Sequence, residues 1–408
     1  MRRHKQILTS QINTTKIAKY LLLVLLLVAM ILPISVALPS YNVVSASSGN
    51  QTFFPIDPVE VTPETINGWV DVNGADFGVP TGATGILLHC VATSAVTDYA
   101  FGLRMNGSTD NRIDAIPYNT HCWAAIGVDA NIIFEAYVGS TTNIDIYIVG
   151  YTMAGVTFFT NAYDKSLTNT SVWEGIDCSA EAPDAVGLIF EIVGDSSASY
   201  KFGLRKNNST DARTTYVGLH SGFGFIIGCD TDQICEGTVN NITVGLYLVG
   251  YITDGATFNT NATNLSLNTT DTWLDLSALP ADSIMGFIEL YYDSKEYGLR
   301  KNGSSEEIYH RAYHHPCAFV ECDADHIIEG KIETTTEDFF LIGYATKPPP
   351  VPPVPPVPIG NTLILISTAT FLVIVVFVTG IRSEDAIATL IVAMIGVAIY
   401  FAIKAILG

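Results

Sequence analysis

Basic residues are scarce in this chain, and their scarcity limits what it can bind. The 408 residues include 20 Lys and Arg against 40 Asp and Glu, for a formal net charge of −20 at pH 7. Residues 47–346 hold 12 of the cations and 38 of the acids, so this part alone is near −26. A field of this sign repels polyanions. We therefore expect no nucleic-acid partner.

Sequence signatures of catalysis are also absent. The chain has no Gly-x-Ser-x-Gly, no His-Glu-x-x-His and no phosphate-binding glycine loop. We therefore predict that it is not an enzyme. Its many carboxylates leave one alternative open, a glycoside hydrolase with two catalytic acids.

Cysteine is scarce as well. Seven cysteines at irregular spacing do not make a disulfide-built scaffold, and a region of about 300 residues can bury a core without one. Disulfides are allowed outside the cytosol, and the sequence offers Cys229 with Cys235 and Cys90 with Cys122. The odd count leaves at least one cysteine unpaired within the chain.

Long apolar runs lie at the two ends. Five Lys and Arg precede the apolar residues 20–32, a pattern typical of a secretory signal peptide, which we assign to residues 1–46. An uncleaved anchor is the alternative. Residues 359–381 and 386–408 are long enough to cross a bilayer as two transmembrane helices joined by a short hairpin. We therefore expect a location in the cell membrane, with the ectodomain on the extracellular side.

Proline is concentrated just before the first of these spans, in the sequence PPPVPPVPPVP at residues 348–358. This density of proline favours an extended polyproline II conformation. We predict a semi-rigid stalk over residues 347–358.

An internal repeat of about 100 residues, the size of one small domain, organises the region between the two ends. We assign the three copies to residues 49–154, 155–254 and 255–346. Each copy opens with Thr-Phe, continues through a tryptophan, a glycine before an apolar run and an arginine, and closes with Gly-Tyr. The Thr-Phe pairs are Thr52-Phe53, Thr157-Phe158 and Thr257-Phe258, the glycines are Gly85, Gly187 and Gly286, and the Gly-Tyr pairs are Gly150-Tyr151, Gly250-Tyr251 and Gly343-Tyr344.

The pattern within each copy is that of consecutive strands. Residues 144–152 and 245–253 are rich in β-branched and aromatic side chains, and Asn106-Gly107 is a strong hairpin-turn signal. We count about eight strands in each copy and no amphipathic helix. The sequence therefore predicts an all-β fold of three tandem antiparallel β-sandwich modules with jelly-roll-like wiring.

Three short segments carry a resemblance to known proteins: GLRMNGST at 102–109, IGVDAN at 126–131 and IVGY at 148–151. The repeat resembles β-sandwich modules of uncharacterised archaeal and phage surface or fibre proteins. This resemblance covers residues 49–346 and implies display at a surface. It implies no catalytic residue.

Each repeat also carries an acidic segment of the form Asp-x-(Asp/Asn)-x-x-x-Glu. Calcium takes six to eight oxygen ligands, which such clusters can supply, although the spacing is not that of an EF-hand. A hairpin turn held by local Asp and Asn hydrogen bonds is the other interpretation. We predict no cofactor and keep calcium as a candidate ligand. The residues are Asp129, Asn131 and Glu135; Asp230, Asp232 and Glu236; and Asp323, Asp325 and Glu329.

Glycosylation sequons are dense in the same region. Several lie in predicted turns, where a glycan is accessible, and we predict that several are modified. The alternative is a coat of polar turn residues. The sequons begin at Asn50, Asn106, Asn169, Asn207, Asn208, Asn241, Asn261, Asn264, Asn268 and Asn302.

Two further side chains recur in all three repeats. We predict that the arginine pairs with an acid of its own repeat, with a ligand-binding arginine as the alternative. We predict that the tryptophan anchors the core, with a sugar-stacking platform as the alternative. Trp123 has no counterpart and is the better candidate for an exposed aromatic. The repeated residues are Arg104, Arg205 and Arg300, and Trp69, Trp173 and Trp273.

Histidines gather in the third repeat. Two of them are four residues apart and would share one face of a strand, an arrangement that can suit a transition metal. The other repeats lack this set and no further ligand has the required spacing, so we predict no such site. The residues are His310, His314, His315 and His326.

These features together favour a membrane-anchored, glycosylated surface protein. Its three modules would serve adhesion, binding, or the structure of a surface layer or envelope. The expected partners are the membrane, glycans or other surface proteins, and copies of the chain itself. A surface-tethered carbohydrate-active enzyme is the alternative.

Overall fold

The computed structural model describes residues 51–348, apart from residues 195–197, 219–221, 292–294 and 312–316. The predicted signal peptide, both predicted transmembrane helices, nearly all of the predicted stalk and the sequon at Asn50 lie outside the described residues. Among the residues that are described, no helix is long and apolar enough to cross a membrane.

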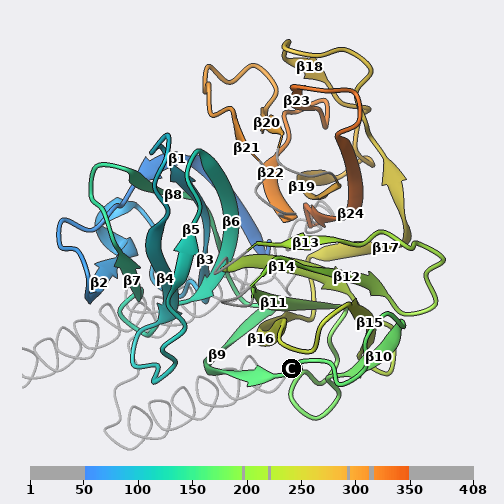
Figure 1. The fold of residues 1–408 in the computed structure, drawn as a ribbon, viewed down its shortest axis with the longest axis horizontal. Coiled ribbons are helices and arrows are strands. Elements are labelled where there is room, and N and C mark those ends of the chain that lie inside the picture. The colour runs from blue at the N-terminus through green and yellow to red at the C-terminus, as the bar shows by residue number, and fades with distance from the viewer. Residues whose placement is uncertain (1–50, 195–197, 219–221, 292–294, 312–316, 349–408) are drawn as a thin grey trace, which may run out of the picture. The chain divides into compact units, whose positions relative to one another are not determined.

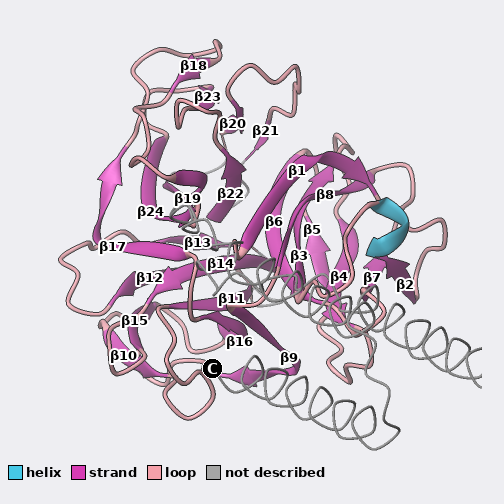
Figure 2. Ribbon diagram, turned by 180° about the vertical axis from the view of Figure 1, so that it is seen from behind, coloured by secondary structure: helices cyan, strands magenta, loops and turns pink. Residues whose placement is uncertain are grey.

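The described part of the chain is all-β, as the sequence predicts. It contains 24 strands, and its one helix is the short 3-10 segment η1 (Gly74–Phe77), as Figure 2 shows. The first repeat holds β1 (Phe53–Glu60), β2 (Trp69–Asn73), β3 (Gly85–Ala92), β4 (Tyr99–Met105), β5 (Asp114–Ile116), β6 (Thr120–Gly127), β7 (Ile133–Val138) and β8 (Ile144–Thr152).

The second and third repeats have the same number of strands. The second holds β9 (Val156–Asp164), β10 (Glu174–Asp177), β11 (Gly187–Val193), β12 (Tyr200–Lys206), β13 (Thr215–Val217), β14 (Gly222–Gly228), β15 (Ile234–Val239) and β16 (Gly245–Ile252). The third holds β17 (Ala256–Asn264), β18 (Leu274–Asp275), β19 (Ser283–Tyr291), β20 (Glu296–Lys301), β21 (His310–Arg311), β22 (Cys317–Glu321), β23 (Ile328–Ile332) and β24 (Asp338–Thr346).

Each repeat forms two sets of four hydrogen-bonded strands in one recurring order (Figure 1). The first repeat has β1-β8-β3-β6 and β2-β7-β4-β5, the second has β9-β16-β11-β14 and β10-β15-β12-β13, and the third has β17-β24-β19-β22 and β18-β23-β20-β21. Pairing within these sets is antiparallel. A single parallel bridge between Arg311 and Thr120 joins β21 to β6, so one set of the first repeat and one of the third form an eight-stranded sheet.

Strand composition explains which faces are buried. In β8 the sequence IDIYIVGYT alternates strictly between buried and half-buried side chains, which is the period-2 pattern of a strand with one face on the core. In β3, a central strand, all eight residues are buried. One buried apolar cluster belongs to the first repeat. A second runs through the other two repeats and takes in Phe53, Leu87, Trp123 and Ala125 of the first.

Strand register corrects two of the landmarks used to align the repeats. Phe53 pairs with Thr152 just as Val156 pairs with Ile252, so Pro55, and not Phe53, is the counterpart of Phe158. Met285 pairs with Ala345, the counterpart of Ile252. Met285, and not Gly286, therefore corresponds to Gly187. Both errors arise because the residues that match in sequence lie one or two positions away from the residues that strand pairing makes equivalent.

Candidate functional site

The arginine that recurs in every repeat pairs with a glutamate directly across the sheet. Arg104 Nε lies 2.8 Å from Glu135 Oε2, and the distance is 2.7 Å for both Arg205–Glu236 and Arg300–Glu329. Each guanidinium lies about 4 Å over the ring of the repeat's own tryptophan, at 4.1, 4.1 and 4.0 Å from the ring centroids. The tryptophans are half-buried against these arginines and are not the predicted core anchors.

The acidic segments form turns in all three repeats. Asp129 Oδ1 accepts hydrogen bonds from the Asn131 and Ile133 amides at 2.8 and 2.9 Å, and its Oδ2 accepts one from Asn106 Nδ2 at 2.9 Å. Asp230 and Asp323 have the same donors at the corresponding positions. Burial opposes ionisation of Asp129, but these hydrogen bonds outweigh it and lower its pKa.

This arrangement already engages two of the three candidate residues in each acidic segment, the first aspartate and the glutamate. The glutamate of each acidic segment is held by its arginine, and no group of three or more His, Cys, Asp or Glu within the described residues is arranged to hold a metal. The geometry is that of the hairpin-turn interpretation. Calcium binding stays a prediction.

Sequons fall into two groups by their surroundings. In Asn106, Asn207 and Asn302 the side-chain amide, which is the atom a glycan would modify, donates to the turn aspartate. Asn169 is exposed, but its amide nitrogen also donates a hydrogen bond, to Glu174 at 2.6 Å. A second group is exposed and accessible: Asn208, Asn261, Asn264 and Asn268. Asn241 is half-buried. Glycosylation itself stays a prediction, and the exposed group is the better placed for it.

The structure places Trp123 in the interior. It is 2% exposed and stacks on His89 at 4.1 Å between ring centroids, so the expectation of an exposed aromatic is wrong. Of the third-repeat histidines, His326 contacts the Ser283 carbonyl and His310 contacts Asn119. His314 and His315 lie outside the described residues.

Neither of the two candidate disulfides is formed. All seven cysteines are free, although Cys90 and Cys122 are opposite each other on β3 and β6. Burial raises the pKa of Cys229 to about 12 and that of Cys235 well above its ordinary value, so both stay thiols in the protein interior.

Contacts between repeats occur at three places, which we call the first joint (repeats 1 and 2), the second joint (repeats 2 and 3) and the third joint (repeats 3 and 1). At the first two joints, a phenylalanine of the later repeat packs against two glycines of the earlier one, and we call this contact the aromatic socket. A Cβ added to Gly85 or Gly127 would collide with Phe158 of the next repeat, and one added to Gly187 or Gly228 would collide with Phe258. Only glycine lets the strand lie this close to the ring.

A polar contact is also common to the first two joints. Asn161 Oδ1 accepts three hydrogen bonds from the preceding repeat, from Ser108 Oγ at 2.9 Å, Thr109 N at 2.8 Å and Thr109 Oγ1 at 3.2 Å. At the second joint Asn261 Oδ1 accepts the corresponding three bonds at the same distances, from Ser209 and Thr210. We call this contact the asparagine lock.

Buried ion pairs complete these two joints. Arg112 lies 2.7 Å from Glu191 and 4.5 Å from the Tyr247 ring centroid. Arg213 pairs with Glu289, which is 1% exposed, and stacks over Phe340. Arg112, Glu191 and Arg213 are half-buried, whereas a carboxylate buried as deeply as that of Glu289 stays ionised only when it is paired.

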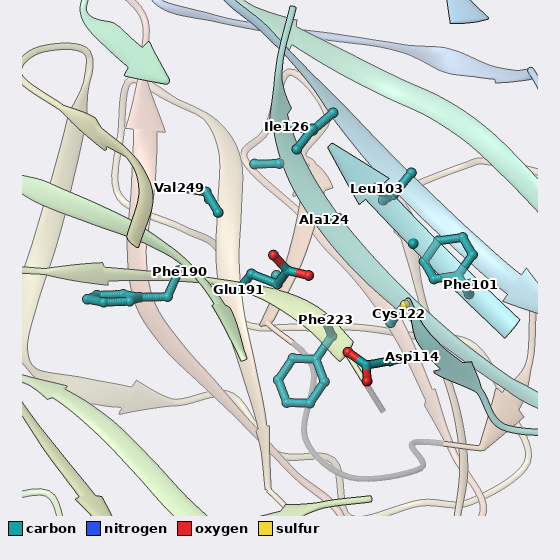
Figure 3. Close-up of a pocket in the computed structure, with 13 residues that line it drawn as sticks. Phe101, Leu103, Asp114, Cys122, Ala124, Ile126, Phe190, Glu191, Phe223 and Val249 are labelled. Carbon is teal, nitrogen blue, oxygen red and sulfur yellow. The ribbon is translucent and has the colours of Figure 1, made fainter. Parts of the chain in front are cut away.

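A small cavity lies beside the ion pair of the first joint. It has a volume of about 40 Å³, and Figure 3 shows the carboxyl groups of Glu191 and Asp114 there, with Phe223 beside them. Burial, assisted by the charge of Glu191, raises the pKa of Asp114 to about 7. Small-molecule sites usually enclose roughly 300–1,000 Å³, so this cavity has room only for a few water molecules.

The third joint is built differently. Strand register places His89 where the other two repeats have Glu191 and Glu289. His89 Nε2 lies 2.9 Å from His121 Nδ1, and the His121 ring lies 4.2 Å from that of Tyr297 in the third repeat. Burial, and then the charge of His310, lowers the pKa of His89 to about 3, so this joint is held without an ion pair there.

A larger cavity opens at the third joint. It has a volume of about 550 Å³ and lies between β1, β3, β6 and β8 of the first repeat and the β20–β22 region of the third. Its polar lining includes Asp57, Lys301, Ser304, Ser305 and Glu306. This cavity is the best candidate for a ligand site in the described residues.

Sequence and structure comparisons give only weak similarity. No protein-family model matches the chain, and no curated protein matches it. A cowpea mosaic virus empty-particle structure is 11% identical over 53% of this chain and 94% of the viral chain, with a TM-score of 0.19. A structure of Sulfolobus turreted icosahedral virus is 9% identical over 72% of this chain and 91% of the viral chain, with a TM-score of 0.19. A structure of an archaeal virus, described by a triple jelly-roll fold and turret assembly, is 9% identical over 72% of this chain and 90% of the viral chain, also with a TM-score of 0.19. At these scores the likeness carries no function to this chain.

Proposed function

We propose that the chain is a membrane-anchored, glycosylated surface protein whose three β-sandwich modules form one head for adhesion, binding or envelope structure. One observation supports the part of this proposal that concerns a single head built from three repeats. The arginine–glutamate pair that recurs in all three repeats holds each repeat together, and the asparagine lock that recurs at two joints holds neighbouring repeats together. The recurrence of these side chains is therefore explained by their role in holding the fold together.

Strand order supports the modular part of the proposal. Each repeat has the order first-eighth-third-sixth in one set of strands and second-seventh-fourth-fifth in the other. This order is that of an eight-stranded jelly roll with two Greek keys. Under the proposal, the proline-rich residues 347–358 act as a stalk and the apolar residues 359–408 anchor the head.

Fractionation of cells tests the surface location. The full chain should sediment with membranes and be cut from intact cells by an added protease. A chain that ends at residue 346 should be secreted into the medium. Recovery of the full chain in the cytosolic fraction would contradict the proposal.

A surface-tethered carbohydrate-active enzyme is the second candidate. The observation in its favour is that Asp57 and Glu306, from different repeats, line the same 550 Å³ cavity. Release of reducing ends from a panel of oligosaccharides, lost in the Glu306→Gln variant, would support it. Absence of hydrolysis across the panel would leave display and binding as the function.

A further inference from the structure

The cavity at the third joint lies where the other two joints have their asparagine lock. β9 leaves its partner strand over residues 159–162, and β17 does so over residues 259–262. These four-residue bulges carry Asn161 and Asn261. The corresponding bulge of β1 covers only residues 56–58, Ile-Asp-Pro, and has no asparagine. All three of its residues line the cavity.

The opposite side of the joint still has the donors of the lock. Ser304 and Ser305 follow the repeated Arg300 at the same spacing as Ser108 and Thr109 follow Arg104. Both serines line the cavity, and Ser305 is exposed. Ser304 Oγ accepts a hydrogen bond from the Glu306 amide at 3.2 Å, and its own hydroxyl makes only a long 3.5 Å contact with the Glu306 carboxylate. No hydrogen bond joins Ser305 to another described residue.

The aromatic socket is missing from this joint as well. Pro55 stands in place of Phe158, and Met285 and Glu321 stand in place of Gly85 and Gly127. Glu321 accepts a hydrogen bond from Lys301 at 2.6 Å at the edge of the cavity. The volume that protein atoms fill at the first two joints is therefore left as a cavity at the third.

We propose that this cavity binds an N-acetylated sugar, whose acetamido oxygen takes the place of the missing asparagine oxygen on Ser304 and Ser305. The Asn161 and Asn261 contacts show that this loop binds a carboxamide oxygen through three donors. Asp57 and Glu306 are acceptors for sugar hydroxyls and repel anions. A volume of 550 Å³ is within the range of small-molecule sites.

This inference deepens the proposed function, since it names a ligand for the displayed head. It fails separately from that function, because a chain that binds no sugar can still be anchored at a surface. The test uses the full chain in detergent, made in a host without N-glycosylation so that no glycan on Asn302 competes. Calorimetric titration with N-acetylglucosamine and with its β-1,4-linked disaccharide should show saturable binding, and glucose should bind at least about tenfold more weakly because it lacks the acetamido group.

Two variants connect the binding to the cavity. Replacing residues 56–58 with the four residues 159–162 rebuilds the asparagine lock at the third joint and should abolish binding. Because this graft can also disturb β1, Ser304→Ala/Ser305→Ala is the second variant and should weaken binding about tenfold. Thr168→Ala/Thr170→Ala, a double change of two exposed hydroxyl residues that lie in the second repeat and outside the cavity, is the matched control and should bind like the unaltered chain.

Several results would overturn the inference. Equal binding of glucose and N-acetylglucosamine would remove the role of the acetamido group, as would no binding of either. Full binding by both the graft and the double alanine variant would place the ligand elsewhere. Stronger binding of a blocked asparagine peptide than of the disaccharide would assign the cavity to a protein partner, and hydrolysis of the disaccharide would assign it to an enzyme.

Discussion

The first two joints and the third bring corresponding surfaces together by different chemistry. The first two use an aromatic socket, an asparagine lock and a buried Arg–Glu pair. The third replaces all three elements and instead packs His89, His121 and Trp123 of one repeat against Tyr297 of another. An internal repeat therefore does not guarantee a repeated interface.

This difference separates two kinds of recurrence in the sequence. Side chains present in all three repeats, such as Arg104 and Asp129, contact partners within their own repeat. Side chains present in only two, such as Arg112 and Asn161, contact the neighbouring repeat. The serine of the asparagine lock is an exception, because it is present in all three repeats and contacts the neighbouring repeat at the first two joints. The third joint, which lacks the side chains that recur in only two repeats, is free to serve another purpose.

Breaking the ion pair of the second joint should have the largest effect. Arg213→Met leaves the carboxylate of Glu289 buried without its cation, which typically costs about 3–5 kcal/mol. Thermal unfolding of the full chain in detergent should show a fall in melting temperature on the order of 10 °C.

The double variant Arg213→Met/Glu289→Leu is the control for this change. It removes both charges and fills the space with apolar groups, an exchange that is often neutral or stabilising. Recovery of most of the lost stability is expected. A double variant as unstable as Arg213→Met would show that the side chains hold the joint by their shape and not by their charges.

Acid should weaken the third joint more than the other two. The pKa of His89 is lowered to about 3 by burial and by His310, and that of His121 is also lowered, by burial, His89 and His310. In the unfolded chain these histidines take up protons near pH 6.5. The neutral histidines therefore make their full contribution to the free energy of unfolding above that pH, and this contribution is lost as the pH falls toward their pKa values in the folded protein. The loss from His89 alone is up to about 3 kcal/mol at pH 4.

Urea unfolding at pH 7.5 and pH 4.5 measures this loss. The variant His89→Gln/His121→Phe should lose less stability between the two pH values than the unaltered chain. An unchanged dependence on pH in this variant would place the acid-sensitive groups outside the third joint.

Much of the fold and of the repeat chemistry follows from the sequence alone. Alternating apolar residues, as in β8, predict the all-β class, and the recurring acids near Arg104 predict its ion pair. These inferences succeed because they rest on local contacts, within a strand or between adjacent strands.

Contacts between repeats could not be read in the same way. Trp123 resembles an exposed aromatic because it has no counterpart in the other repeats, and its burial between His89 of its own repeat and Tyr297 of the third depends on the contact between repeats. The Thr-Phe landmark misaligns β1 because the motif of the first repeat lies two residues before the position that strand pairing gives it. A comparison of Asn161 with Asn261 and of Arg112 with Arg213 at the repeat period was the signal that would have located two of the joints.

Asp114 gives the first joint a pH response of the opposite sign. Its pKa is raised to about 7 by burial and by Glu191, so its stability contribution is complete below about pH 4 and is lost as the pH rises through 7. Asp114→Asn should therefore raise the free energy of unfolding by about 1–3 kcal/mol at pH 8, allowing for its partial exposure. Urea unfolding at pH 4 should show no such gain, and equal gains at both pH values would exclude this explanation.

The smallest effect is expected from calcium, whose candidate residues occupy the same positions in all three repeats and lie within them. Asp230 already accepts hydrogen bonds from three donors, which together lower its pKa against burial, and Glu236 is paired with Arg205. A bound ion would have to displace these partners. Melting temperatures of the full chain in calcium and in chelator, at matched ionic strength, should therefore differ by less than about 2 °C. Saturating binding at a hundredfold excess over Kd would instead add about 2.7 kcal/mol per site. A rise of about 5 °C or more that is lost in Asp232→Ala, a residue whose side chain is exposed and outside the ion pair, would establish a calcium site in these turns.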